Sequence, residues 1–304
     1  MNIQIVFGQS FVVNFPAFSN APTANPRSLT VAGESSLLQV QLDVSTSSTA
    51  GADVVIQLPT GVEYVSGSVA LVSTNANLTI TENGGTANAP QFKIGPNNLT
   101  AGNRIVFTIE RKANCAARSY ILGGGTFKDS VSATIGGNTT TENSSSYQVV
   151  YPVFSLIQPA NQSNAVVGGN YTRTFTISNG GNGCSTSVYF SVDHTSNGIE
   201  LNDTDGAGPA TGIAITSING VSLTTPIHLT PISTSGSVKN YMIPAANLPG
   251  GDFCNGESIE ITESYKLKSC NAVTNYVAGW GTSATNLCQQ VNGTGSLREQ
   301  LQLR

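Results

Sequence analysis

A strand pattern that occurs twice constrains the fold of this chain more than any other feature. Residues 102–110 (Gly-Asn-Arg-Ile-Val-Phe-Thr-Ile-Glu) lead to Cys115, and residues 256–262 (Gly-Glu-Ser-Ile-Glu-Ile-Thr) lead to Cys270. Both segments begin at a glycine and then carry apolar residues at alternate positions. Because successive side chains of a strand point to opposite faces, this spacing predicts one buried face and one solvated face.

A second alternating segment precedes each copy. Residues 38–44 are Leu-Gln-Val-Gln-Leu-Asp-Val, and residues 171–177 are Tyr-Thr-Arg-Thr-Phe-Thr-Ile. A strand with one apolar face needs a second layer to cover it, so the duplicated unit predicts two antiparallel β-sandwiches. No segment has the pattern of a helix of three or more turns, which agrees with the content of 32 glycines. The predicted class is all-β.

Turn residues and chain length set the expected domain boundaries. A length of 304 residues suggests about two domains. We expect an extended N-terminal segment over residues 1–27, a first sandwich over 28–152 and a second sandwich, containing the disulfides, over 153–292. Residues 293–304 are expected to start a linker or a further element. The edge strand within residues 1–15 is a candidate for docking a partner by strand addition.

The composition excludes several classes of protein. Charged residues make up only 10% of the chain, against about 25% in average soluble domains. The solvated surface must therefore consist mainly of Ser, Thr, Asn and Gly, which suit strands and turns. A net charge of −4 without a basic cluster argues against nucleic-acid binding. No apolar run reaches the roughly 18 residues of a membrane-spanning helix, so no membrane span is predicted.

Five cysteines favour an exported protein, in which disulfides persist. Cys184, Cys254, Cys270 and Cys288 lie in the second half, and four cysteines allow three pairings. Because Cys254 and Cys270 flank one strand and its turn, we favour the pairs Cys254–Cys270 and Cys184–Cys288. Cys115 is alone in the first half, and is either a buried free thiol or bonded to a partner outside the chain.

No set of residues points to catalysis, and we predict that the chain is not an enzyme. Its two histidines, His194 and His228, lie in different strand regions. Asp193 precedes His194, but adjacent residues of a strand point to opposite faces, so a Ser-His-Asp arrangement through this pair is a poor one. We therefore predict structural roles for both histidines.

The segment around residue 202 is the best candidate for an ion site. Glu200, Asn202, Asp203 and Asp205 place several oxygen ligands on a turn that contains a glycine, as Ca²⁺ requires. The EF-hand pattern is absent, because no glutamate follows at the required spacing. The segment is therefore either a solvated turn or a calcium site. No other cofactor is predicted.

Trp280 lies between two glycines on a predicted strand. Two roles fit this position. Trp280 is either a core residue that packs near Cys270, or an accessible flat ring on which a sugar stacks.

Several segments resemble known surface proteins. Residues 59–68 (Pro-Thr-Gly-Val-Glu-Tyr-Val-Ser-Gly-Ser) and residues 167–181 resemble the Ig-like repeats of very large bacterial surface proteins. Residues 276–281 (Tyr-Val-Ala-Gly-Trp-Gly), followed by Cys288, are similar to repeats in surface proteins of gliding Bacteroidetes; those often have a cysteine after Trp-Gly, where this chain has Thr282. The resemblance implies tandem Ig-like antiparallel β-sandwich domains in a secreted protein at the bacterial cell surface.

The same resemblance implies a function. It points to a structural and adhesive segment of a large adhesin, which serves gliding motility and surface attachment. The implied partners are neighbouring repeats of the same long chain, the secretion or motility machinery, and surface glycans. Asp129-Ser130-Val131 resembles the O-glycosylation signal of Bacteroidetes, in which Ser130 would carry the sugar. The alternative is a carbohydrate-binding module of an exported polysaccharide-degrading protein.

Overall fold

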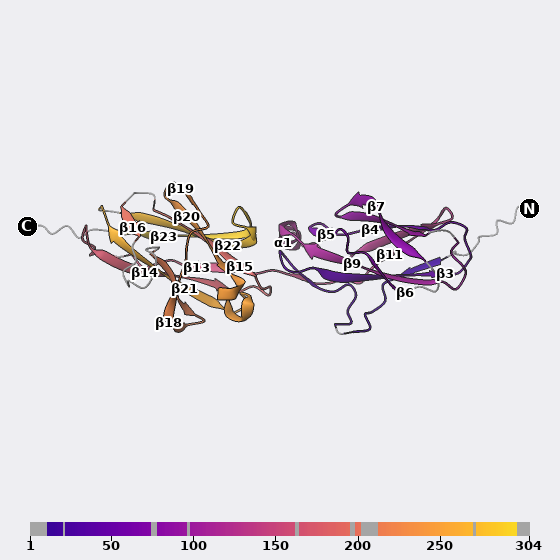
Figure 1. Ribbon diagram of the computed structural model, residues 1–304, viewed down its shortest axis with the longest axis horizontal. Coiled ribbons are helices and arrows are strands. Elements are labelled where there is room, and N and C mark those ends of the chain that lie inside the picture. Colours follow the sequence, from indigo (N-terminus) through magenta and orange to yellow (C-terminus); the bar gives the residue numbers. More distant parts are fainter. Residues whose placement is uncertain are drawn as a thin grey trace, which may run out of the picture. The chain divides into compact units, whose positions relative to one another are not determined.

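The chain forms two compact units. The computed structural model describes residues 11–20, 22–73, 78–95, 98–161, 164–194, 198–201, 212–269 and 272–296. Unit 1 is Met1–Val150 and unit 2 is Tyr151–Arg304, and Figure 1 shows two layers of strands in each. The predicted all-β class, with an antiparallel β-sandwich in each unit, is confirmed.

Unit 1 is built from two five-stranded sheets. The first has the order β1-β3-β9-β5, with β6 also paired to β9, and the second has the order β11-β10-β4-β8-β7. A short parallel pair joins β2 to β12. The bounds are β1 (Phe11–Asn14), β2 (Leu29–Thr30), β3 (Ser36–Val44), β4 (Ala52–Gln57), β5 (Val62–Tyr64), β6 (Ala70–Ser73), β7 (Thr79–Thr86), β8 (Ala89–Gly95), β9 (Arg104–Ala113), α1 (Cys115–Leu122), β10 (Ser130–Ile135), β11 (Asn138–Asn143) and β12 (Val149–Val150).

The alternation of apolar and polar residues along the strands correctly predicts which side chains form the core of unit 1. Leu38, Val40, Leu42 and Val44 of β3 are buried, and the polar residues between them are only partly covered. β9 pairs along β3, so that Leu38 lies opposite Ile109 and Val40 opposite Phe107. Burying each such side chain stabilises the folded state by about 1.5–3 kcal/mol.

Helix α1 follows the repeated strand β9 and begins at Cys115. The Oδ1 atom of Asn114 accepts a hydrogen bond from the backbone N–H of Ala116 at 2.9 Å, the interaction typical of an N-cap residue. The helix has eight residues, which is about two turns. It is therefore shorter than the helices of three or more turns for which the sequence shows no pattern. In the described part of the chain, no helix is long and apolar enough to cross a membrane.

Unit 2 also consists of two antiparallel sheets. The first has the order β13-β14-β21-β17-β18, with β16 also paired to β21, and the second has the order β19-β20-β15-β22-β23. The bounds are β13 (Phe154–Ile157), β14 (Asn170–Asn179), β15 (Ser187–Asp193), β16 (Ile199–Leu201), β17 (Ile213–Ile218), β18 (Val221–His228), β19 (Ser233–Ser235), β20 (Val238–Pro244), β21 (Ser258–Leu267), β22 (Val273–Ser283) and β23 (Asn286–Ser296), with 3-10 turns at Ala245–Asn247 and Pro249–Gly251.

The two units have the same strand order. The sheet β11-β10-β4-β8-β7 of unit 1 corresponds to β23-β22-β15-β20-β19 of unit 2, and β1-β3-β9 corresponds to β13-β14-β21. The duplicated sequence pattern falls on the equivalent strands β9 and β21. One equivalent pair differs in chemistry: where unit 1 has Leu38 opposite Ile109, unit 2 has Arg173 opposite Glu263.

Candidate functional site

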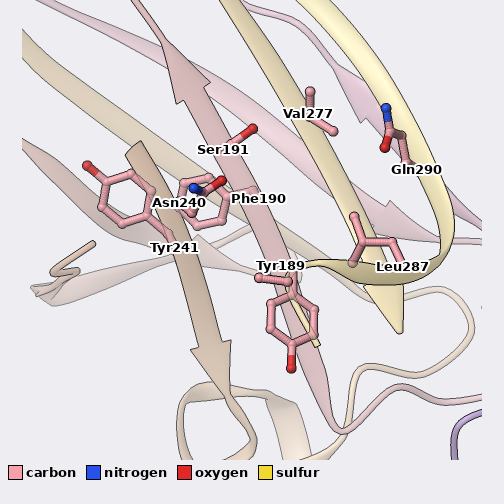
Figure 2. Close-up of a pocket in the computed structure, with 9 residues that line it drawn as sticks. Tyr189, Phe190, Ser191, Asn240, Tyr241, Val277, Leu287 and Gln290 are labelled. Atoms are coloured by element: carbon pink, nitrogen blue, oxygen red, sulfur yellow. The ribbon is translucent and has the colours of Figure 1, made fainter. Parts of the chain in front are cut away.

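A cleft of about 230 Å³ lies on the outer face of the second sheet of unit 2 (Figure 2). It is lined by β15, β20, β22, β23 and the turn between the last two, through Tyr189, Phe190, Ser191, Asn240, Tyr241, Val277, Ala284, Leu287 and Gln290. Phe190 and Tyr241 are buried, with their rings stacked at 4.8 Å. The remaining side chains form the accessible wall.

The strand register determines which residues are neighbours on this face. Tyr189 on β15 lies opposite Gly279 on β22, and Gly279 lies opposite Gln290 on β23. Gly279 has no side chain, and the space beside it is occupied by the Gln289 carbonyl oxygen and the Leu287 side chain. In the next row, Ser191 lies opposite Val277.

The β22–β23 hairpin bounds one end of the cleft. Its register shifts between Trp280 and Gly281 and again between Gly281 and Ser283. Such bulges bend a strand, and in Figure 2 the end of the hairpin curves over the sheet towards β15. A Cβ atom placed on Gly279 would lie 2.9 Å from the Cδ1 atom of Leu287. Leu287 therefore covers the outer face at this glycine.

The wall of the cleft carries no fixed charge. Its polar groups are the phenol of Tyr189, the hydroxyl of Ser191 and the amides of Asn240 and Gln290, among apolar residues such as Leu287. An uncharged, mixed lining suits a neutral ligand that has both polar and apolar surface.

Sequence reasoning missed this cleft. Alternation predicts that Tyr189 and Ser191 face away from the core, but it does not show which outward residues of four strands become neighbours. No local pattern of the sequence marks it. Trp280 is 1% exposed, so its core role is confirmed and the sugar-stacking role at this residue is wrong.

A buried charge cluster lies inside unit 2, apart from the cleft. The carboxylate of Glu263 is fully buried; it accepts hydrogen bonds from Arg173 Nε at 2.5 Å and from the Tyr276 hydroxyl at 2.7 Å, and it contacts His194 Nε2. Burial alone would raise the pKa of Glu263, but the His194 hydrogen bond and the Arg173 charge outweigh burial and lower the pKa to about 2. This environment fits the predicted structural role of His194. Asp193 instead accepts a hydrogen bond from Ser237.

We expect acid to destabilise unit 2 through Glu263. The carboxyl titrates near its ordinary value of 4.5 in the unfolded chain and near 2 in the folded unit. Its contribution is therefore present above about pH 4.5 and lost as the pH falls towards 2, and the shift corresponds to about 3 kcal/mol. Trp280 is the sole tryptophan of the sequence and lies in unit 2, so denaturant titrations followed by its fluorescence measure this loss.

The control for this prediction is Glu263→Gln, which should flatten the acid dependence of the Trp280 transition. An unchanged acid slope in that variant would show that another group is responsible. The buried carboxylate of unit 1 behaves in the opposite way: burial raises the pKa of Asp129 even beside Arg111. Asp129 therefore does not contribute to acid destabilisation.

The glycosylation candidate Ser130 lies on β10 and is partly buried. Its neighbour Asp129 is fully buried, and its carboxylate accepts hydrogen bonds from Arg111 Nη1 at 2.6 Å and from the Tyr147 hydroxyl at 2.9 Å. Asp129 thus has a core role, whatever the state of Ser130. Modification of Ser130 stays a prediction.

Of the four calcium candidates, Glu200 alone lies in the described residues. Its carboxylate pairs with Lys268 Nζ at 2.5 Å. Asn202, Asp203 and Asp205 lie outside the described residues. Within the described ranges, no group of three or more His, Cys, Asp or Glu side chains could hold a metal ion. The calcium site stays a prediction.

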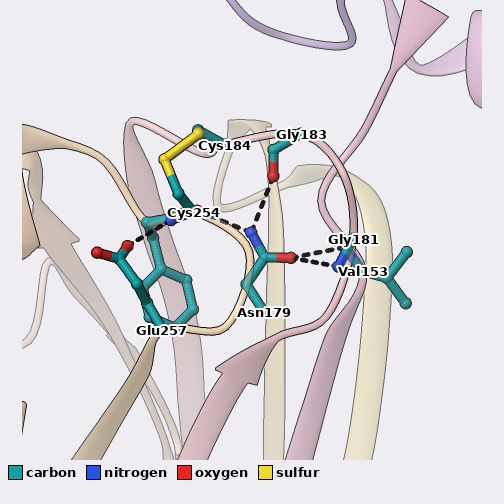
Figure 3. Close-up of a disulfide and its surroundings, with 8 residues drawn as sticks. Val153, Asn179, Gly181, Gly183, Cys184, Cys254 and Glu257 are labelled. Carbon is teal, nitrogen blue, oxygen red and sulfur yellow. Dashed lines mark hydrogen bonds between the residues drawn. A yellow bond between two sulfur atoms is a disulfide. The ribbon is translucent and has the colours of Figure 1, made fainter. Parts of the chain in front are cut away.

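The structure corrects the disulfide pairing. Cys184 is bonded to Cys254, with their Cα atoms 4.1 Å apart (Figure 3), so the expected pairs Cys184–Cys288 and Cys254–Cys270 are both wrong. The neighbours Ser185 and Phe253 form an antiparallel bridge with backbone hydrogen bonds at 3.0 and 2.8 Å. This bridge sets the two cysteines directly opposite each other, as in a non-hydrogen-bonded antiparallel pair.

The state of the remaining cysteines agrees with expectation only in part. Cys115 is disulfide-bonded, so the free-thiol alternative is wrong, and Cys288 is disulfide-bonded too. Cys270 lies outside the described residues.

Asn179 organises the chain around the disulfide (Figure 3). Its Nδ2 atom donates to the carbonyl oxygens of Gly183 and Phe253 at 2.9 and 2.8 Å, and its Oδ1 atom accepts from the N–H groups of Val153 and Gly181 at 3.0 and 2.9 Å. A buried primary amide can make about four hydrogen bonds, and Asn179 makes all of them. The amide joins the start of unit 2 to the Cys184–Cys254 loops.

Comparisons with known proteins give only loose likenesses. No protein-family model matches the chain, and no curated protein matches it. The C-terminal domain of the AgI/II polypeptide BspA of Streptococcus agalactiae is 10% identical with a TM-score of 0.45, over 95% of this chain and 99% of that chain. The collagen adhesin CNA of S. aureus is 8% identical with a TM-score of 0.26, over 96% of this chain and 92% of that chain. At these TM-scores neither likeness carries a conclusion about the function of this chain.

Proposed function

We propose that this chain is a structural and adhesive segment of a large secreted adhesin at the bacterial cell surface, and that it is not an enzyme. Its role is to transmit load and to hold binding surfaces away from the cell. The strand arrangement at the ends of each unit is the observation that carries this proposal.

In unit 2, the first and last strands lie side by side and run in the same direction. Gln289 on β23 accepts from the N–H of Phe154 on β13 at 2.9 Å. Beyond the end of β13, Gln158 accepts from the N–H of Thr294 on β23 at 2.9 Å, and Asn161 accepts from Ser296. Pulling the two ends apart therefore shears these interactions together instead of breaking them one by one.

Unit 1 has a parallel strand pair of its own, formed by different strands. The N–H of Leu29 donates to the carbonyl of Gln148 at 3.0 Å, and the N–H of Val31 donates to that of Val150 at 2.9 Å. These bonds join β2 to β12 in parallel register. An early and a late strand of unit 1 thus meet in the same shear geometry.

The surface chemistry and the sequence resemblance support the finer proposal. A chain with 10% charged residues offers few sites to trypsin-like proteases, and disulfides fit an oxidising compartment. The motifs that resemble surface repeats of gliding Bacteroidetes suggest gliding motility as the setting and further repeats of the same chain as neighbours. A deletion of the segment from the parent gene should reduce colony spreading and attachment while the remaining protein stays on the surface.

Single-molecule pulling tests the load-bearing role. The full chain is stretched from its ends in a Cys115→Ser/Cys288→Ser background, so that the Cys184–Cys254 bond is the remaining described disulfide. Reductant should lengthen the unfolding step of unit 2 by about 25 nm, because 70 residues are released at roughly 3.5 Å each. The increase in length on adding reductant identifies which unfolding step belongs to unit 2. Gln158→Ala/Asn161→Ala should then lower its unfolding force.

Gln91→Ala, on an exposed outer position of β8 in unit 1, is the matched control and should leave that force unchanged. A unit 2 step without a measurable force peak would refute the load-bearing role. An equal force in the Gln158→Ala/Asn161→Ala variant would refute the proposed shear contacts.

The alternative of a carbohydrate-binding module gains support from the cleft, although not from Trp280. The parent reading frame distinguishes the two functions: further sandwich units favour the adhesin, and an adjoining polysaccharide-degrading domain favours the module.

A further inference from the structure

We infer that the cleft of unit 2 binds a neutral saccharide, with Tyr189 and Gln290 as its main contacts. This inference deepens the adhesive part of the proposed function and rests on it. It differs from the sugar platform considered for Trp280, because the side chains involved lie on the opposite face of the sheet.

Comparison with unit 1 shows that the cleft is a specific feature of unit 2. The equivalent hairpin of unit 1, β10–β11, pairs without a register shift from Ser130–Asn143 to Ile135–Asn138. The β22–β23 hairpin is longer and has two register shifts near its end. The bulges therefore add to unit 2 a wall that the common strand order does not require.

On the equivalent outer face of unit 1, polar side chains bond to one another. Lys93 and Asp53 form an ion pair across it at 2.8 Å. Thr134 and Thr139 hydrogen-bond to each other at 2.9 Å. Polar groups on that face therefore satisfy one another and leave less hydrogen-bonding capacity for a ligand.

In the cleft, the amide groups are positioned but not saturated. Asn240 Nδ2 donates to Ser233 Oγ at 3.0 Å, and Gln290 Nε2 donates to Asn292 Oδ1 at 3.3 Å. Within the described residues, neither amide oxygen accepts a hydrogen bond. Each oxygen can accept from a ligand hydroxyl, and each NH₂ group has a second N–H to donate.

Charge and size narrow the class of ligand. The lining has no cation to balance a carboxylate or sulfate and no anion to balance an amine, and burying an uncompensated ligand charge is costly. A cleft of about 230 Å³ is smaller than the roughly 300–1,000 Å³ pockets that hold drug-sized molecules. It therefore accommodates one or two rings of a longer chain.

A neutral sugar ring matches the remaining features. It has an apolar C–H face for the Tyr189 ring and for Leu287, and hydroxyl groups that both donate and accept for the amides of Asn240 and Gln290. An extended peptide that adds to a sheet would use the backbone of an edge strand, whereas this cleft lies on the face of the central strands β15 and β22. The geometry thus favours a saccharide over a peptide.

Binding of defined oligosaccharides to the full chain tests the inference. The probes are cellohexaose, laminarihexaose, maltohexaose and mannohexaose, with hexagalacturonate as the charged comparison, measured by isothermal titration and saturation-transfer NMR. We expect at least one neutral probe to bind with a Kd of roughly 1 mM or tighter. Tyr189→Ala and Gln290→Ala should each weaken that binding by about tenfold.

Two further variants test whether binding occurs in the cleft. Ser191→Tyr fills the cleft without removing the proposed contacts and should abolish binding, while Gln91→Ala on the equivalent face of unit 1 should leave it unchanged. Circular dichroism melting confirms that each variant is folded.

Three results would overturn the inference: no neutral probe binds, the cleft variants bind as well as the parent, or hexagalacturonate binds as tightly as the neutral probes. None of these results affects the pulling experiment, so a failure of saccharide binding is distinguishable from a failure of the load-bearing role.

Discussion

Replacing Glu263 by alanine should lower the free energy of unfolding of unit 2 by about 3–5 kcal/mol, since it leaves a buried cation without its partner. Arg173 would lose its carboxylate, and the Tyr276 hydroxyl and His194 would lose an acceptor. Such a loss is a large part of the roughly 5–15 kcal/mol that keeps a domain folded. Guanidinium titration followed by Trp280 fluorescence measures it.

Glu260→Ala is the matched control, because Glu260 lies on the same strand with its side chain on the opposite face. It should change the stability by about 0.5 kcal/mol or less. A loss in Glu263→Ala no larger than in Glu260→Ala would show that the buried cluster does not hold unit 2 together.

Unit 1 suggests a rescue of this variant. Its equivalent strand pair is Leu38 opposite Ile109, so Arg173→Leu/Glu263→Ile transfers that apolar pair into unit 2. Replacing a buried ion pair by packed apolar residues is often neutral or stabilising. The double variant should therefore recover most of the stability, except for the part that His194 and Tyr276 lose. A double variant as unstable as Glu263→Ala would contradict the equivalence of the two cores.

Removing the Cys184–Cys254 disulfide should lower the stability of unit 2 by about 4 kcal/mol. The bond joins residues separated by 70 positions, and a cross-link over a loop of this length restricts the unfolded chain by about that amount. The test is Cys184→Ser/Cys254→Ser in the Cys115→Ser/Cys288→Ser background, again followed by Trp280 fluorescence. Dithiothreitol should destabilise the background chain equally and have no further effect once Cys184 and Cys254 are replaced.

A loss below about 1 kcal/mol would mean that the hydrogen bonds around Asn179 hold these loops without the cross-link. Asn179→Ala in the oxidised chain separates the two contributions, because it removes four hydrogen bonds and leaves the disulfide in place.

The strands and their buried faces could be predicted from the amino-acid sequence. Alternation in β3, β9, β14 and β21 depends on side chains that are near neighbours in the chain, so a local pattern is sufficient to predict it. The duplicated pattern also located the two equivalent strand pairs. Arg173 is an exception, because its charge argues against the core position that it occupies. Its partner Glu263 lies opposite it on a neighbouring strand that is distant in the sequence.

Which residues distant in the sequence come into contact is visible only in the folded chain. Cys184 pairs with Cys254 because the bridge between Ser185 and Phe253 aligns two loops 70 positions apart. The cleft likewise depends on the order of β20, β15, β22 and β23 and on two bulges in one hairpin. Strand order and register are set by the packing of the whole sandwich, so residues such as Tyr189 and Gln290 become neighbours through long-range pairing that no local pattern encodes.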